Sequence, residues 1–281
     1  MFQPVIPLSG NSGWKYLQST YDHQLQIHSD SARVKADRNY LVEKFSKPVT
    51  TEAFLADKRL MRVALTAFDL GGEEWKRGFI GKVLKEVATP ESTFLARLNN
   101  PKYTAFAQAF KPVNGQITVT PEALDNLSAA FDANSFETAV GEVDDSMRLA
   151  LNYQSDIAGL VNTGSSEETI LFRILGNVPI RKVLEAAINL PSDIRKLPIE
   201  KQAELLKQGV QKRLGVNDLT ELASPEKIDQ VIKRFHAVQG VSNGAANYSS
   251  AANALTLLNG GAGLGGQGGI NLFLSGLSSR P

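Results

Sequence analysis

Helix-start signals are the sequence feature that most constrains the fold of this chain. Four segments place a capping residue directly before a proline: Thr89-Pro90, Asn100-Pro101, Thr120-Pro121 and Ser224-Pro225. The capping side chain can accept a hydrogen bond from a free amide of the first turn, while proline at the first helical position loses only an amide that had no partner. Ser165 and Glu168 have the spacing of a capping box and predict a fifth helix start.

Apolar residues between these starts recur at helical spacing. Two sets each form one stripe on a helix: Ile80, Val83, Leu84, Val87 and Ala88, and Ile180, Val183, Leu184, Ala187 and Ile188. Strand-like alternation is confined to residues 116–119, a run too short to found a sheet. The chain is therefore predicted to be all-α, a bundle of about ten to twelve helices.

Glycines mark where three of these helices are expected to end. Gly71, Gly176 and Gly215 each follow an apolar run, and each could adopt the left-handed conformation that closes a helix.

The two stripes lie one hundred positions apart, which suggests an internal repeat. The sequence from Met61 to Leu65 is also echoed by the sequence from Met147 to Leu151. Amphipathic helices resemble one another by chance, so duplication and coincidence both stay open. If the repeat is real, residues 50–111 and 134–215 are two versions of one helical unit.

A break in composition separates a predicted helical body, residues 1–235, from a tail, residues 236–281. From Phe235 to Ser279, 45 consecutive residues contain no Asp, Glu, Lys or Arg, and 10 of the 23 glycines lie between Gly240 and Gly276. Ordering a glycine-rich segment costs much conformational entropy, so we expect the tail to be flexible in isolation.

The tail nevertheless carries apolar residues at helical spacing. The candidate partner-binding residues are Leu255, Leu258, Ile270, Phe273, Leu274 and Leu277. Short amphipathic segments around a glycine hinge are typical of sequences that become ordered on a protein partner or on a second copy of the chain. The alternative is a low-complexity extension without a function of its own.

Composition argues against several classes of function. The chain has 30 Lys plus Arg against 29 Asp plus Glu, a net charge of +1, which provides no field for nucleic acid. It has no cysteine and three histidines, so we expect no cofactor, no metal and no thiol chemistry. No apolar run reaches the length of about 18 residues that a membrane span needs. The opening has early prolines and no basic stretch, so we expect no secretory signal and a cytoplasmic protein.

The histidines and one glycine motif are candidate sites with weak support. Residues 261–266 match the dinucleotide pattern GxGxxG, but no acidic residue follows. His23 and His28 are five residues apart, which places them on different faces of a helix. His28 is predicted at the partly exposed end of a core-facing stripe, and His236 at the end of the helix that starts at Pro225. All three are predicted to be structural.

The densest acidic cluster consists of Glu137, Glu142, Asp144 and Asp145. It is interpreted as the negatively charged first turn of a helix, with Ser146 nearby. Paired carboxylates can also act as acid and base, so a hydrolase or lyase built on them is the alternative. A deep pocket lined by these carboxylates and Arg148 would favour the enzyme.

Five stretches carry a resemblance to a known family. They are FQPVIPL from Phe2, DKRLMRVALTAFDL from Asp57, FIGKVLKEV from Phe79, LARLNNPKYTAFAQAF from Leu95 and SFETAVGEVDDSMRLALN from Ser135. The chain resembles, over residues 1–235, a bacterial family of unknown function whose genes commonly lie among flagellar genes. The resemblance implies an all-helical protein associated with the flagellum and brings no catalytic residue.

The functional prediction is accordingly a non-catalytic helical protein of the bacterial flagellum that binds protein partners, and we expect these partners to be flagellar components. Two alternatives stay open: the hydrolase or lyase, and a flagellar export chaperone. The protein would act in the cytoplasm, or in the flagellum or basal body after export without a cleavable signal.

Overall fold

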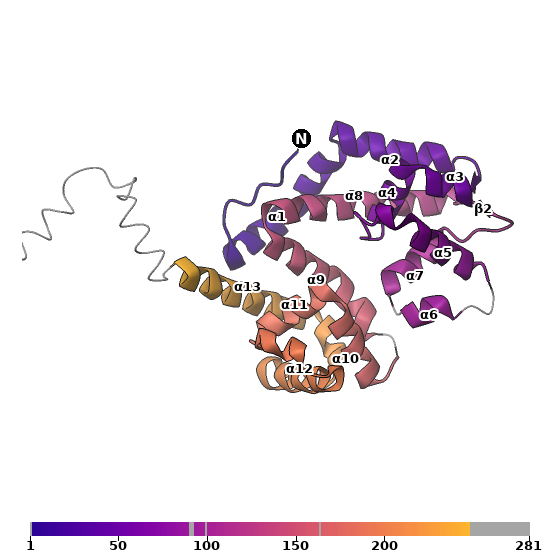
Figure 1. The fold of residues 1–281 in the computed structure, drawn as a ribbon. Helices are drawn as coiled ribbons and strands as arrows, with labels where there is room; N and C mark the ends of the chain where they lie inside the picture. The colour runs from indigo at the N-terminus through magenta and orange to yellow at the C-terminus, as the bar shows by residue number, and fades with distance from the viewer. Residues whose placement is uncertain (1, 90–92, 99, 163, 248–281) are drawn as a thin grey trace, which may run out of the picture.

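The computed structural model describes residues 2–89, 93–98, 100–162 and 164–247, and these residues form mainly helices (Figure 1). The α-helices within them are α1 (Gly10–Ser29), α2 (Ala32–Phe45), α3 (Thr51–Ala56), α4 (Lys58–Thr66), α5 (Arg77–Val87), α6 (Phe94–Leu98), α7 (Pro101–Ala109), α8 (Pro121–Val143), α9 (Asp145–Val161), α10 (Glu167–Gly176), α11 (Val178–Ala187), α12 (Ile199–Leu214) and α13 (Pro225–Asn247). Short 3-10 helices lie at η1 (Glu74–Lys76), η2 (Ser192–Lys196) and η3 (Leu219–Ala223). The all-α prediction is confirmed.

Two very short strands accompany the helices. β1 (Val49–Thr50) pairs antiparallel with β2 (Gln116–Ile117), so that Val49 lies opposite Ile117. The strand-like run at residues 116–119 therefore contributes one small pairing and no larger sheet within the described residues.

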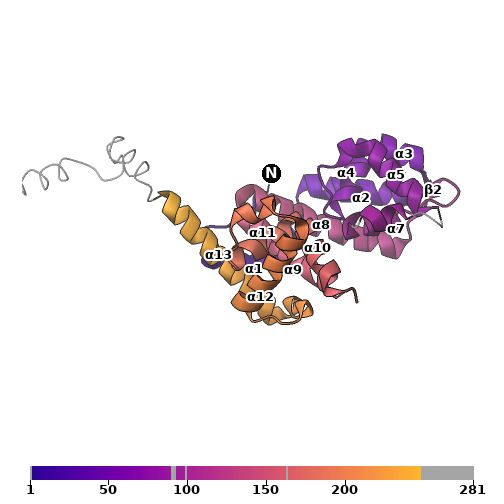
Figure 2. The same ribbon diagram turned by 60° about the horizontal axis from the view of Figure 1, so that its bottom comes forward.

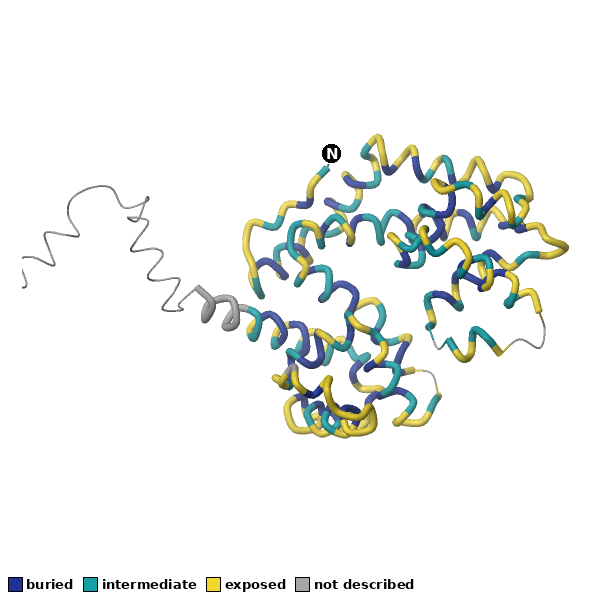
Figure 3. The backbone as a smooth tube through the Cα atoms, in the orientation of Figure 1, coloured by how far each residue is buried: buried dark blue, intermediate teal, exposed yellow. Residues whose placement is uncertain are grey.

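The helices enclose two hydrophobic cores. The first core contains buried residues of α2 to α5, α7 and the first half of α8. The second core contains buried residues of α1, the second half of α8, and α9 to α13. Buried positions recur along the helices in both halves of the molecule (Figure 3). The protein is thus organised as two helical groups that share one helix.

Helix α8 belongs to both cores because its buried face changes along its length. Leu124, Leu127 and Phe131 are buried in the first core, and Phe136 and Val140 in the second. At about 100° per residue, these two sets project from nearly opposite sides of the helix. The two cores therefore lie on opposite sides of α8.

The first residues of the chain form a strap, residues 2–8, against the second core. The Val5 amide donates to Gln24 Oε1 at 2.8 Å, and Gln24 Nε2 donates to the Val5 carbonyl at 3.1 Å. The Phe2 ring lies 6.4 Å from the ring of Phe136. The strap leads into α1, which packs beside α8 and α13 (Figure 2). The stretch FQPVIPL, one of the five that carry the family resemblance, therefore holds the start of the chain against α1 and the second core.

Three of the predicted helix starts are confirmed. Asn100 Oδ1 accepts from the Lys102 amide at 3.0 Å, and Thr120 Oγ1 from the Ala123 amide at 3.3 Å. Ser224 precedes α13, as expected. Pro90 lies outside the described residues.

The capping-box prediction is wrong by one residue. Ser166, and not Ser165, caps α10 and accepts from the Thr169 amide. Two serines in succession offered the same local signal, and the packing of Ile170 and Leu171 into the second core decides the phase of the helix.

The predicted left-handed helix caps are confirmed at one glycine of three. Gly215 closes α12 with a φ of 65°, in the left-handed conformation. Gly176 is the last residue of α10, but the cap is Asn177 in an extended conformation. Gly71 lies beyond the end of α4, and the left-handed residues of that turn are Asp69 and Gly72. An aspartate adopts this conformation more readily than most residues, which is why a glycine signal misplaced the turn.

Helix α13 continues past the predicted boundary at residue 235 and ends at Asn247. The candidate tail residues from Leu255 to Leu277 and the GxGxxG motif lie outside the described residues. The repeat stays a prediction. Its two matched helices, α5 and α11, have different neighbours: α5 packs against α3, α6 and α7, and α11 against α9, α10 and α13.

We predict that Gly13→Ala destabilises the protein by about 2 kcal/mol or more, since overpacking a closed site costs that order of energy. A Cβ atom at position 13 would lie 1.9 Å from the Leu8 carbonyl oxygen and 2.9 Å from Met147 Cε. Urea unfolding followed by circular dichroism measures the loss.

Gly159→Ala in α9 is the matched control for this substitution. A Cβ atom there meets nothing within 4 Å. Because alanine favours helix, this variant should gain about 0.5–1 kcal/mol. Equal effects of the two substitutions would contradict the contact between the strap and α1.

Candidate functional site

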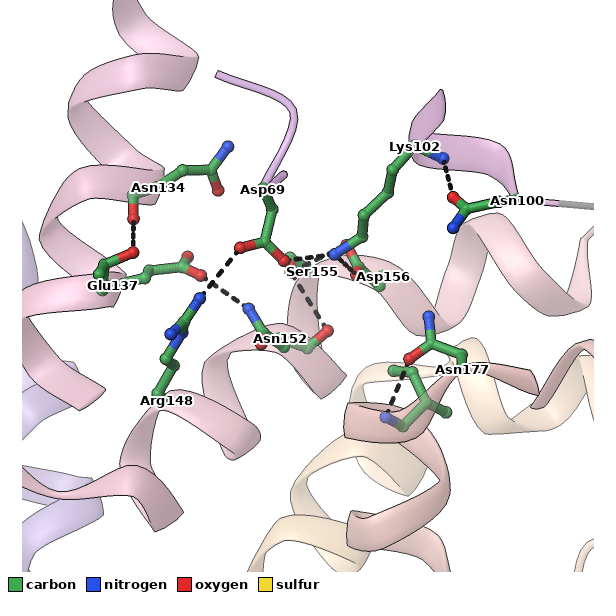
Figure 4. A network of polar contacts seen from close by, with 12 residues as sticks. Asp69, Asn100, Lys102, Asn134, Glu137, Arg148, Asn152, Ser155, Asp156 and Asn177 are labelled. Carbon is green, nitrogen blue, oxygen red and sulfur yellow. Dashed lines mark hydrogen bonds and ion pairs between the residues drawn. The ribbon is translucent and has the colours of Figure 1, made fainter. Parts of the chain in front are cut away.

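A network of polar side chains lies where the two cores meet (Figure 4). We call it the seam and define it as Asp69, Lys102, Glu137, Arg148, Asn152 and Asp156. Its members come from the turn after α4, from α7, from α8 and from α9. The seam therefore joins the first core to the second.

Lys102 is the centre of the seam. Its Nζ atom forms ion pairs with Asp69 and, at 2.8 Å, with Asp156 Oδ2. Arg148 Nη2 lies 3.3 Å from the other oxygen of Asp69. Burial alone would lower the pKa of Lys102, but Asp156 and Asp69 outweigh it and raise that pKa. The lysine therefore remains charged.

Local structure explains why these side chains converge. Asp69 has a φ of 52°, which turns the chain sharply after α4 and presents its carboxylate to the seam. Lys102 follows the Asn100 cap, in the first turn of α7. Arg148, Asn152 and Asp156 are spaced four residues apart on α9, so they share one face of that helix.

Glu137 is the most perturbed carboxyl group of the seam. It accepts a hydrogen bond from Asn152 Nδ2 at 3.1 Å and is 8% exposed. Burial, with the nearby charges of Asp69 and Asp156, raises its pKa from 4.5 to about 7. Burial also raises the pKa of Tyr21, whose hydroxyl interacts with Glu137. Glu137 can therefore exchange a proton near neutral pH.

Two open clefts flank Lys102. One, of about 640 Å³, is lined by Asp69, Arg148 and Asn152, and the other, of about 330 Å³, by Asn134 and Asp156. Glu137 lines neither of them. The group with the strongest potential for acid–base chemistry is thus separated from the space that a substrate could enter.

The predicted acidic cluster does not converge on one point. Asp144 caps α9 and accepts from the Ser146 amide at 2.9 Å, as the first-turn interpretation predicted. Glu142 lines one cavity with Arg148, while Asp145 lines the 640 Å³ cleft with the same arginine. The break between α8 and α9 sends these carboxylates in different directions.

The histidines differ in their surroundings. His23 is exposed. His28 is buried, not partly exposed as predicted, and its Nε2 lies 2.9 Å from Ser135 Oγ. His236 is not at a helix end, because α13 continues to Asn247. It is 1% exposed beside Trp14, and burial lowers its pKa to about 4, so it is neutral and cannot interact with a helix dipole as a cation.

Two further kinds of site concern the described part of the chain: a metal site and a membrane span. Among its residues, no group of three or more His, Cys, Asp or Glu side chains could hold a metal ion. None of its helices is long and apolar enough to cross a membrane.

Sequence reasoning missed Asp69, Lys102, Asn152 and Asp156. One local signal was present: a polar stripe at four-residue spacing, from Arg148 to Asp156, on a helix that is otherwise largely buried. No local signal indicated that Asp69 and Lys102 would meet it.

The fold and the seam define an all-helical protein with two hydrophobic cores on one shared helix. Residues 67–228, more than half of the chain, match the family described as "Protein of unknown function (DUF1217)", and the chain belongs to this family. The predicted resemblance to a family of unknown function is confirmed.

One solved structure extends this comparison. The fold is similar to the crystal structure of protein AGR_C_984 from Agrobacterium tumefaciens, with a TM-score of 0.67 and 22% sequence identity over 86% of this chain and 99% of that chain. This structural similarity, at 22% sequence identity, shows a common fold. No curated protein matches the sequence.

We predict that Glu137→Gln changes how stability depends on pH. The wild-type folded state holds the Glu137 proton to higher pH than the unfolded state, because its pKa is raised from 4.5 to about 7. Wild-type stability should therefore fall by about 3 kcal/mol as pH rises through this window. The glutamine variant lacks this loss, so it should gain stability relative to the wild type between pH 5 and pH 8, as measured by urea unfolding. Parallel pH profiles would contradict a raised pKa.

We also predict that Lys102→Met destabilises the protein by about 2–4 kcal/mol, because it leaves two largely buried carboxylates without their cation. Asp69 is 17% exposed and Asp156 27%. Lys201→Met is the control, since it breaks an exposed pair with Glu204 and should cost about 0.5 kcal/mol or less. Similar losses in the two variants, by thermal and urea unfolding, would contradict a structural seam.

Proposed function

We propose that this protein is a non-catalytic helical interaction protein associated with the bacterial flagellum. The observation that carries the non-catalytic part is the pairing within the seam: Lys102 and Arg148 are engaged with Asp69 and Asp156. Side chains that pair with each other in this way stabilise a fold, and the Lys102 ammonium, whose pKa is raised, has no lone pair with which to act as a nucleophile. The flagellar part rests on the resemblance of the five sequence stretches.

The hydrolase or lyase alternative lacks a convergent site. An acid and a base must both reach one reacting group, at hydrogen-bonding distance. Glu137 is paired with Asn152 below the surface, Asp144 is occupied as a helix cap, and Glu142 and Asp145 line different cavities. The geometry supports an interaction role better than catalysis.

We propose that the tail supplies part of the partner-binding surface, through Leu255, Leu258, Ile270, Phe273, Leu274 and Leu277. Helix α13 leads to this segment from the second core and ends at Asn247. A tail variant should therefore begin at residue 248, so that it leaves α13 whole. Flagellar components, or a second copy of the chain, are the proposed partners.

The decisive experiment is a clean deletion of the gene, scored by swimming and by electron microscopy of flagella, followed by complementation. The full chain should restore swimming. The double variant Phe273→Ser with Leu277→Ser should restore less, because it removes two apolar contacts worth about 1.5–3 kcal/mol each when buried.

The double variant Ser275→Ala with Ser278→Ala is the matched control, since it changes the same segment without removing apolar residues. Normal motility and normal filaments in the deletion strain would refute the flagellar role. Full complementation by the Phe273→Ser, Leu277→Ser variant would refute the role of the tail and leave the flagellar role standing.

A further inference from the structure

We propose that the cavity enclosed by α2, α4, α8 and the N-terminal strap binds a small free carboxylic acid with an apolar chain. The cavity has a volume of about 710 Å³. Sites for small molecules usually fall between about 300 and 1,000 Å³. The three helices pack against one another (Figure 1), and residues of each line the cavity. We call it the strap cavity.

Part of the lining of the strap cavity is apolar. Phe2, Val34, Phe131 and Ala139 line it. Val34 and Phe131 belong to the first core, while Phe2 reaches the cavity from the strap, where its ring meets the ring of His28 edge-on at 5.7 Å. Apolar walls from both halves of the molecule therefore face one space, and a hydrocarbon chain would gain free energy by burial there.

The charged residues of the lining carry a surplus of positive charge. Arg33, Arg62 and Arg148 line the cavity against two carboxylates, Asp37 and Glu142. Asp37 is already neutralised, because Arg59 and Arg62 each bind one of its oxygens at 2.8 Å. The lining groups therefore sum to a charge of about +1 with His28 neutral, and burial lowers the pKa of His28.

Arg33 is the guanidinium most available to a ligand. It is exposed on α2 and forms no ion pair with another residue in the described part of the chain. Arg148, by contrast, is engaged by Asp69 at 3.3 Å. An arginine without a carboxylate partner offers a planar pair of donors that suits a carboxylate.

Backbone amides add further donors beside these arginines. Gly71 and Gly72 line the strap cavity, and their amides donate to no acceptor within the described residues. Gly72 has a φ of 84°. Consecutive free amides in a left-handed turn are a common way to bind an anion.

These features favour one class of ligand. A single carboxylate matches the surplus charge, and an apolar chain matches the apolar residues of the lining. A nucleotide would bring several negative charges to a surplus of about one, and a neutral lipid would gain nothing from the charge of Arg33. The complementarity of charge and apolar surface is what supports the carboxylic acid.

The experiment titrates decanoate, below its micelle concentration, into the full chain and follows methyl resonances by nuclear magnetic resonance. The methyl groups of Val34 and Ala139 should shift, while those of Val178 and Ile199, exposed elsewhere, should not. Decanol should bind at least about tenfold more weakly, since it lacks the charge that pairs with arginine. Decyl phosphate tests whether the head group must be a carboxylate.

Arg33→Glu should weaken decanoate binding by at least about tenfold. Lys35→Glu is the matched control: it makes the same change of charge on α2, at an exposed residue that does not line the cavity, and should change affinity by less than about twofold. Both substitutions lie on the surface, so thermal unfolding should be unchanged.

Four outcomes would overturn the proposal: no binding of decanoate, equal binding of decanol, tighter binding of decyl phosphate than of decanoate, or equal losses in the two charge variants. None of these outcomes bears on the flagellar role, which is tested separately by deletion.

Discussion

The structure depends on the change of buried face along α8. A helix that buries one continuous stripe can serve one core, whereas α8 buries Phe131 on one side and Phe136 on nearly the opposite side. Each half of the chain can then pack its own set of helices without the two cores merging. The clefts, the seam and the strap cavity all lie beside this helix or the turn that follows it.

Two cores on opposite sides of one helix need further contacts to fix their relative position. The seam provides them through Lys102, which connects α7 of the first core with Asp156 on α9 of the second. The strap packs on the second core, where the Phe2 ring lies against Phe136, and Phe2 also lines the cavity beside His28.

These arrangements connect structure to the proposed role. A protein that binds partners benefits from a stable body and from surfaces that remain free. In the seam, Lys102 and Arg148 are paired with carboxylates. Arg33 has no ion-pair partner, and the amides of Gly71 and Gly72 donate to no acceptor, within the described residues. Polar groups of similar chemistry thus have different roles, according to whether a neighbouring element supplies their partner.

The sequence by itself determined the helical class and many of the boundaries, because caps and apolar stripes act over three to eight residues. Asn100 and Thr120 cap the helices they were predicted to cap, and the stripe from Ile180 is buried as predicted. The stripe from Ile80 is buried at its first three positions, while Val87 is half-buried and Ala88 is exposed. Gly215 closes α12 for the same local reason.

Only the tertiary structure decided which polar residues meet. Asp69 and Lys102 are far apart in sequence, and no periodicity relates a turn after one helix to the first turn of another. A local pattern could not predict the environment of His236 either. Its pKa is lowered because α13, which carries it, packs against Trp14 of α1. Local rules describe how a segment folds, whereas burial and charge pairing depend on which segments pack together, and that is a property of the whole chain.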